Sequence, residues 1–175
     1  MKLAQDKFAK TLNELPFSGE AVHRLKLADA QDQIGRGFVI HSTAGMTVKF
    51  GEILKRHFER EKDDQRARFL EAAKIAAREP AEVWENNFRH YYVARLRRLD
   101  SGELGFVVVA AQIGDADDDV ITFFTKDARE LKKFRTGKLI HQKGRAGGSS
   151  AGAVAAFTAT YRLQHHHIEC RRRVR

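Results

Sequence analysis

Three short apolar runs follow one another between His90 and Thr125, and they constrain the fold more than any other part of the chain. Each run is rich in Val, Ile, Tyr, Phe and Thr, and Gly, Asp or Ser residues separate one run from the next. This composition is typical of strands joined by tight turns. The sequence therefore predicts three consecutive antiparallel strands, at residues 90–99, 104–113 and 120–125.

The first of these strands has two different faces. Because side chains alternate along a strand, Tyr92 lies on an apolar face and Tyr91 on an aromatic and cationic one. The apolar face also holds Ala94 and Leu96, and the other face also holds Val93, Arg95 and Arg97. The middle strand contains the unbroken apolar run 106–109, so we expect it to be central and covered at least partly on both sides. A sheet whose open side is aromatic and basic is suited to binding a phosphodiester chain.

The size of the chain, 175 residues, corresponds to about one domain with a buried core. The apolar fraction of 42% is too high for a fully disordered chain, and no apolar run is long enough to span a bilayer. The first ten residues are too charged for a secretory signal, so we expect a cytoplasmic protein, or one that a phage virion delivers to the host cytoplasm. The single Cys170 excludes an internal disulfide framework and a cysteine-based zinc site.

The net charge of +9 favours an anionic partner, and nucleic acid is the commonest one. Residues 146–175 hold five arginines and one glutamate, so a net charge of +5 remains for the rest of the chain. A solvated, lysine-rich surface would give the same composition.

Helices and two further strands are expected around the three central strands. We expect helices at residues 2–15, 18–35, 47–65, 66–79 and 126–134, and strands at 36–42 and 136–142. Ser18, Thr47 and Thr125 are candidate helix caps, while Pro16 and Pro80 end the helices before them.

The chain divides into three predicted parts: an N-terminal helical extension at 1–37, a domain at 38–143, and a flexible tail rich in Gly, Ser, His and Arg at 144–175. The extension either belongs to the domain or ends a preceding module. The tail is interpreted first as a foreign addition, such as a frameshifted end, and otherwise as a basic nucleic-acid tail or a metal-binding histidine tract.

Six short motifs follow one another along the chain in a characteristic order. They are ILKRH (53–57), PAEVW (80–84), YYVARLR (91–97), FVVVAA (106–111), VITFFT (120–125) and GKLI (137–140). In this order they resemble phage-encoded nucleases of the barnase, EndoU, colicin and RelE-like superfamily, over roughly residues 38–143. The resemblance implies an α+β fold with N-terminal helices packed on a four-stranded antiparallel meander sheet. It also implies RNA cleavage without a metal or other cofactor.

The same resemblance implies partners. These are RNA, with tRNA as one candidate, an immunity or antitoxin protein, and a phage head-morphogenesis protein as the parent chain; no membrane is among them. The tail has no counterpart in the family pattern.

Cleavage of RNA through its 2′-hydroxyl requires a base, an acid, and cations or hydrogen-bond donors around the phosphorane. His57 is the first candidate for proton transfer, because an unperturbed imidazole pKa of about 6.5 suits transfer near neutrality. A half-exposed helix histidine without a catalytic role would give the same spacing. His41, His141 and His90 are the alternatives.

Arg95 is the candidate for the scissile phosphate, because a guanidinium matches two phosphate oxygens, and Arg97 is its substitute. Tyr91 would stack a base or offer a hydroxyl, while Tyr92 is either core or a reserve for the same task. An exposed strand cation and a core aromatic are the non-functional alternatives. Further candidates are the Thr122 hydroxyl at the phosphate and the Lys55 and Lys138 ammonium groups on the substrate.

The acidic turn at 114–119 lacks the spacing of a calcium-binding loop, and we interpret it as a solvated hairpin turn. Phosphate-binding loops, dinucleotide fingerprints and HExxH motifs are missing from the sequence. Two hypotheses follow: a metal-independent RNA endonuclease acting through a 2′,3′-cyclic phosphate, and a catalytically inactive RNA-binding or phage head-morphogenesis module.

Overall fold

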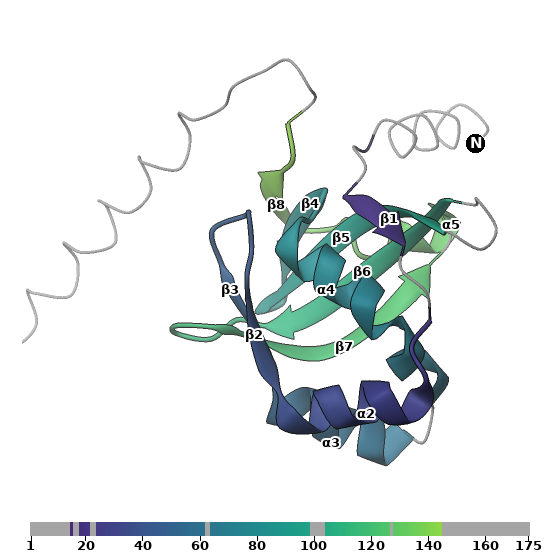
Figure 1. Cartoon of the computed structure of the whole chain (residues 1–175). Helices are drawn as coiled ribbons and strands as arrows, with labels where there is room; N and C mark the ends of the chain where they lie inside the picture. Colours follow the sequence, from purple (N-terminus) through teal and green to yellow (C-terminus); the bar gives the residue numbers. More distant parts are fainter. Residues whose placement is uncertain are drawn as a thin grey trace, which may run out of the picture. The chain divides into compact units, whose positions relative to one another are not determined.

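The computed structural model describes residues 15, 18–21, 24–61, 64–98, 104–126 and 128–144. The chain divides into two compact units, residues 1–143 and 144–175, and every described residue except Gly144 lies in the first. Within the described residues, helices and a large curled sheet make an α+β fold (Figure 1).

In the part of the chain that the structure describes, eight strands form one sheet. They are β1 (Gly19–Ala21), β2 (Phe38–His41), β3 (Thr47–Phe50), β4 (Glu82–Asn86), β5 (Arg89–Arg98), β6 (Leu104–Gln112), β7 (Asp118–Lys126) and β8 (Lys138–Gln142). Seven strands lie in the order β2-β3-β7-β6-β5-β4-β8, and β1 pairs with β5 outside this path. The β3–β7 and β1–β5 pairs are parallel and the other pairs are antiparallel, so the sheet is mixed.

The expected four-stranded antiparallel meander sheet is therefore wrong. The strands β5, β6 and β7 do follow one another as an antiparallel meander, but they are only the centre of the sheet. Two features make the observed sheet larger than the predicted one. The hairpin β2–β3 joins β7 through a parallel pairing at Val48↔Asp118 and Lys49↔Asp119, and β4 separates β5 from β8.

The helices are α2 (Leu27–Arg36), α3 (Glu52–Glu61), α4 (Leu70–Arg78) and the short α5 (Ala128–Leu131), with a 3-10 helix η1 (Asp64–Phe69) before α4. In Figure 1, α4 crosses one face of the sheet, and α2 and α3 lie together beside β2 and β7. The buried face of α4 is made of alanines, whose small side chains let the helix lie close to the strands. They are Ala72, Ala73, Ala76 and Ala77.

The main core fills the space between these helices and the sheet. Tyr92, Ala94 and Leu96 of β5 point into it, together with Val107 and Val109 of β6. The apolar face predicted for the first central strand is thus the face that the helices cover.

A second, smaller core covers part of the other face, where Val93, Phe106 and Val108 pack with Leu131 of α5. The middle strand is therefore buried on both sides, as expected. We predicted that the basic side of β5 is open. This prediction is wrong at the centre of the strand, where Arg95 is only 8% exposed.

Several predicted elements have other bounds. Thr47 does not cap a helix, because residues 47–50 form β3, in which Val48 and Phe50 are buried and Lys49 is exposed. Thr125 lies inside β7 and caps no helix. The expected helix at 18–35 is a short strand followed by α2, and the helix expected at 66–79 begins as η1. The expected helix at 2–15 lies outside the described residues except for Leu15.

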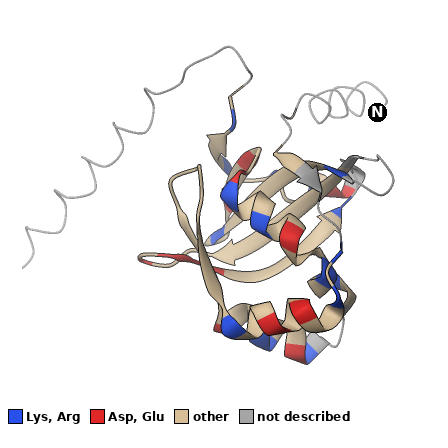
Figure 2. Ribbon diagram, viewed as in Figure 1, with Lys and Arg blue, Asp and Glu red and all other residues tan. Residues whose placement is uncertain are grey.

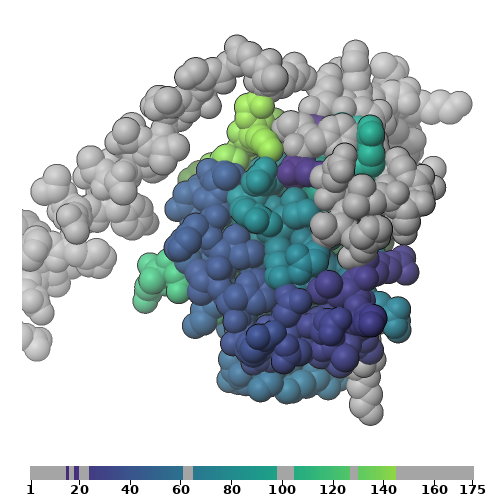
Figure 3. Space-filling view, viewed as in Figure 1, coloured from purple at the N-terminus to yellow at the C-terminus, as the bar shows by residue number. Residues whose placement is uncertain are grey.

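Charged residues are distributed over the helices and strand ends, and the turn between β6 and β7 is acidic (Figure 2). The space-filling view shows the β2–β3 hairpin and α2 beside α4 (Figure 3). In the described part of the chain, no helix is long and apolar enough to cross a membrane.

Candidate active site

One row of side chains crosses the sheet on the face opposite α4. Tyr91 of β5 is the register partner of Ala110 in β6, and Ala110 is the partner of Thr122 in β7. Since side chains in register share a face, Tyr91 and Thr122 point the same way, with only a methyl group between them. Both side chains are half-buried, and the Tyr91 ring packs against Phe134, with the ring centroids 5.7 Å apart.

An arginine from outside the sheet reaches this row. The guanidinium Nη1 of Arg66, in η1, donates a long hydrogen bond of 3.5 Å to the hydroxyl of Thr122. The β6–β7 register shifts by one residue between Ala110 and Ala111, next to Thr122. Such a bulge bends the strand and re-aims the side chains beside it. A cation and a hydroxyl therefore meet on β7, beyond the short stretch that pairs with β3.

The helix α3 packs against the same strand. The ring centroids of Phe58 in α3 and Phe123 in β7 are 5.4 Å apart. His57 and Thr122 are the sequence neighbours of these two rings, and the buried Leu54 anchors the helix one turn earlier. We call the seam between α3, η1 and β7 the Thr122 seam. It holds the contact between the Arg66 guanidinium and the Thr122 hydroxyl, and His57 lies on the helix that packs against β7 through Phe58. Because neighbours in a strand point to opposite faces, Phe123 faces the helices and Thr122 faces away from them. His57 is half-buried and its Nε2 atom is shielded from solvent.

Arg95 lies elsewhere. It shares the face of Tyr91 but is four residues further along β5, about 13 Å at the usual rise per residue. Its Nη1 atom donates to the backbone carbonyl of Leu15 at 2.9 Å. Arg97 is exposed near the end of β5, two residues beyond. The structure therefore does not bring Arg95 or Arg97 to the Thr122 seam, and their phosphate roles stay predictions.

Tyr92 belongs to a buried polar cluster on the helix-covered face. Its hydroxyl donates to the Asp118 carboxylate, and the same oxygen is 2.5 Å from Nδ1 of His90. Burial, together with this hydrogen bond and the charge of Asp118, strongly raises the pKa of Tyr92. The cluster joins β5 to the start of β7. Tyr92 is fully buried and His90 is 8% exposed, so neither is placed to meet a polymer.

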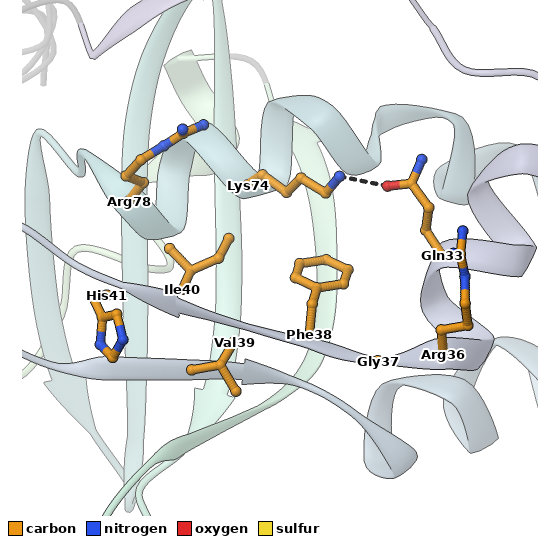
Figure 4. A pocket seen from close by; sticks show the side chains of 9 residues that line it. All are labelled: Gln33, Arg36, Gly37, Phe38, Val39, Ile40, His41, Lys74 and Arg78. Atoms are coloured by element: carbon orange, nitrogen blue, oxygen red, sulfur yellow. Dashed lines mark hydrogen bonds between the residues drawn. The ribbon is translucent and has the colours of Figure 1, made fainter.

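A cavity of about 690 Å³ lies between the edge strand β2, the end of α2 and α4 (Figure 4). His41 lines it, and its Nδ1 atom is 3.5 Å from the Thr47 hydroxyl. Lys74, which also lines the cavity, is bound to Gln33 at 2.5 Å and to Glu71 at 2.6 Å. Arg36, Lys74 and Arg78 make the lining of the cavity cationic. The Lys74 ammonium, however, already binds Gln33 and Glu71.

The remaining predicted residues lie on two other elements. His141 is half-buried in β8, where burial lowers its pKa. Lys138 is exposed at the start of β8, opposite Glu85 of β4 and two strands from Tyr91. Lys55 lies in α3 and lines a second cavity of about 410 Å³ with Lys49. Among the described residues, no three His, Cys, Asp or Glu side chains gather as a metal site would require.

One known family matches most of the chain. The family model described as phage-Barnase-EndoU-ColicinE5/D-RelE like nuclease 2 matches residues 23–142. The chain belongs to this family. No curated protein and no solved structure matches the chain. The suspected membership in the phage nuclease family is thus confirmed, and the chain is a nuclease domain by family. The match also includes α2.

Arg66 is a residue of the Thr122 seam that sequence reasoning missed. The segment around it carries Arg66 and Arg68 on a run predicted as an ordinary helix, in which neither arginine is distinguished. The signal for Asp118 was equally weak, because it is one of several acidic residues in a turn expected to be solvated. Only the alternation of the following strand, extended backwards by two residues, could have placed it in β7.

Proposed function

We propose that this member of the phage nuclease family is a metal-independent RNA endonuclease whose active site is the Thr122 seam. The observation that carries the proposal is the approach of the Arg66 guanidinium to the Thr122 hydroxyl beside the helix that bears His57. Family membership supports nuclease activity, and the net charge of +9 supports a polyanionic substrate.

His57 would transfer the proton between the 2′-hydroxyl or the leaving oxygen and solvent. Arg66 and Thr122 would donate hydrogen bonds to the phosphoryl oxygens, where negative charge develops in the transition state. Tyr91, in the same row, would contact the neighbouring nucleotide. Attack by the 2′-oxygen on phosphorus expels the 5′-oxygen and leaves a 2′,3′-cyclic phosphate. This mechanism needs no metal.

The test is incubation of the purified chain with a labelled single-stranded RNA in EDTA. We expect fragments with 2′,3′-cyclic phosphate ends, and no cleavage of an RNA that carries a 2′-deoxy sugar at the cut position. Cleavage only after magnesium is added, or cleavage of that deoxy position, would overturn the mechanism. tRNA and total cellular RNA are the first natural substrates to examine.

Two variants locate the site. His57→Gln should lower kcat by roughly two to four orders of magnitude, which is typical for the loss of a general acid or base. The matched control is His41→Gln, because His41 is exposed on the edge strand β2. We expect this control to cleave at the wild-type rate. A chain that binds RNA with steep salt dependence but never cuts would support the inactive RNA-binding module instead.

A further inference from the structure

The hairpin between β4 and β5 turns through two residues, Asn87 and Phe88. Asn86 and Arg89 are the last register pair, and φ is +49° at Asn87 and +59° at Phe88. A two-residue loop with both φ angles positive is a type I′ turn, in which Asn followed by Gly is the usual choice. A bulky side chain at the second position brings its Cβ close to the following carbonyl oxygen. Phe88 therefore sits in an unfavourable backbone conformation.

The side chain of Phe88 gains nothing from packing that would offset this conformation. The residue is 87% exposed, whereas the next most exposed large apolar residue in the described part of the chain, Val39, is 50% exposed. Strained residues that the fold does not need are common at ligand-binding positions. The aromatic ring at this tip is thus a candidate for contact with a ligand.

The tip lies at the end of the face that carries Tyr91 and Thr122. Arg89 is exposed and directly follows Phe88, and two residues later, about 6.6 Å along the strand, comes Tyr91 on the same face. Tyr91 is in the row that ends at Thr122. An extended chain lying on Tyr91 and continuing past Arg89 would thus reach the Phe88 ring.

We propose that Phe88 stacks on an unpaired base of a single-stranded RNA, with Arg89 on the adjoining phosphate. This inference rests on the proposed function, and it specifies in addition that the RNA substrate is single-stranded where it meets Phe88. The surroundings favour a nucleotide over a protein partner, because the residues paired at the base of the turn, Asn86, Arg89 and Gln112, are polar or cationic. Ile113, whose amide donates to the Phe88 carbonyl at 3.1 Å, is a single apolar residue beside them. A base in a duplex is stacked on its neighbours, whereas an unpaired base is free to stack on an aromatic ring.

The test measures binding without cleavage, so that it is independent of the catalytic proposal. The probe is a single-stranded 2′-O-methyl RNA with 2-aminopurine at successive positions, and the proteins are the wild type, Phe88→Gly and Phe88→Trp. We expect Phe88→Gly to bind about 5- to 150-fold more weakly, the range for the loss of one stacked base, and to lose the quenching of 2-aminopurine at one position. Phe88→Trp should retain both.

Stability gives a second readout. Glycine accepts a positive φ without a steric penalty, so Phe88→Gly should have a higher melting temperature than the wild type while it binds RNA more weakly. The matched control is Val39→Ala, which removes another exposed apolar side chain and should leave affinity unchanged.

Equal affinity of Phe88→Gly and the wild type would overturn the inference, even if the wild type cleaves RNA. Quenching that depends on Phe88 in a chain that cuts no RNA would uphold it and reject only the catalytic proposal. Equally weakened binding of a blunt RNA duplex would also contradict the preference for an unpaired base.

Discussion

The carboxylate of Glu82 accepts two hydrogen bonds from the Arg135 guanidinium, with Nε–Oε2 and Nη2–Oε1 distances of 2.7 and 2.8 Å. The Trp84 indole donates a third hydrogen bond to it, at 2.8 Å. Glu82 is 1% exposed and lies in β4, whereas Arg135 lies in the segment between α5 and β8. This pair fastens that segment onto the sheet, beside the second core.

The first prediction concerns this ion pair. Arg135→Met should lower the free energy of unfolding by about 3–5 kcal/mol, because it leaves a buried carboxylate without its cation. The double variant Glu82→Leu with Arg135→Met should lose much less, since no charge remains buried. Urea unfolding checks both. The exposed Arg36–Asp32 pair is the control, and Arg36→Met should change stability by less than about 1 kcal/mol. A double variant no more stable than Arg135→Met would contradict the argument.

The second prediction separates two arginines. Arg95→Met should destabilise the fold by about 1–3 kcal/mol, because the Leu15 carbonyl loses a buried donor, yet the folded variant should keep the wild-type kcat. Arg66→Met should do the opposite, with nearly unchanged stability and a kcat about 10²–10³-fold lower, as for a donor at a developing oxyanion. RNA cleavage and urea unfolding of the same preparations give both values. A large loss of kcat in Arg95→Met alone would return the phosphate role to Arg95.

The third prediction is a dependence of stability on acid. Burial lowers the pKa of His141 below its ordinary value of 6.5, so the folded state favours the neutral imidazole. Its contribution to stability is present above pH 6.5 and is lost as the pH falls through the lowered folded-state pKa, because the unfolded chain binds the proton first. His141→Gln should therefore lose less stability than the wild type between pH 6.5 and pH 5. Parallel pH profiles would contradict this.

The fourth prediction concerns alkaline pH. The raised pKa of Tyr92 keeps its hydroxyl protonated in the folded state, whereas the same group ionises near pH 10 in the unfolded chain. Stability from this group is complete below pH 10 and falls by about 1.4 kcal/mol per pH unit above it. Tyr92→Phe should lack this slope. The difference in unfolding free energy between wild type and variant should be constant below pH 10 and shrink above it; a constant difference throughout would refute the prediction.

The centre of the fold could be predicted because its strands are apolar and separated by clear turns. β5, β6 and β7 agree with the expected runs to within two residues at every boundary. The strand β4 was missed because its polar residues, Glu82 and Glu85, resemble a loop, and Glu82 is compatible with burial only through Arg135, 53 positions later. A partner so distant leaves no local pattern in the sequence.

The strand β3 was missed for a different reason. Its four residues run directly into α3 through Gly51, so the alternation of Val48 and Phe50 merged with the helical spacing that follows. The helix itself was expected, and so was His57 upon it. The position of Arg95 could not be foreseen, because alternation assigns a face to a side chain but not what covers that face, and here Leu15 accepts its hydrogen bond.

The two parallel pairings of the sheet bear on the order in which the molecule folds. Gly19 pairs with Leu96 and Val48 pairs with Asp118, so these partners are 77 and 70 positions apart in the chain. Contacts between such distant residues form slowly, because a long loop must close, at a cost in chain entropy, before the contacts stabilise the structure. During synthesis, α3 with His57 is complete well before β7 with Thr122 exists. The proposed catalytic groups therefore meet only after most of the sheet has been made, so on the proposed function the growing chain stays inert towards RNA until then.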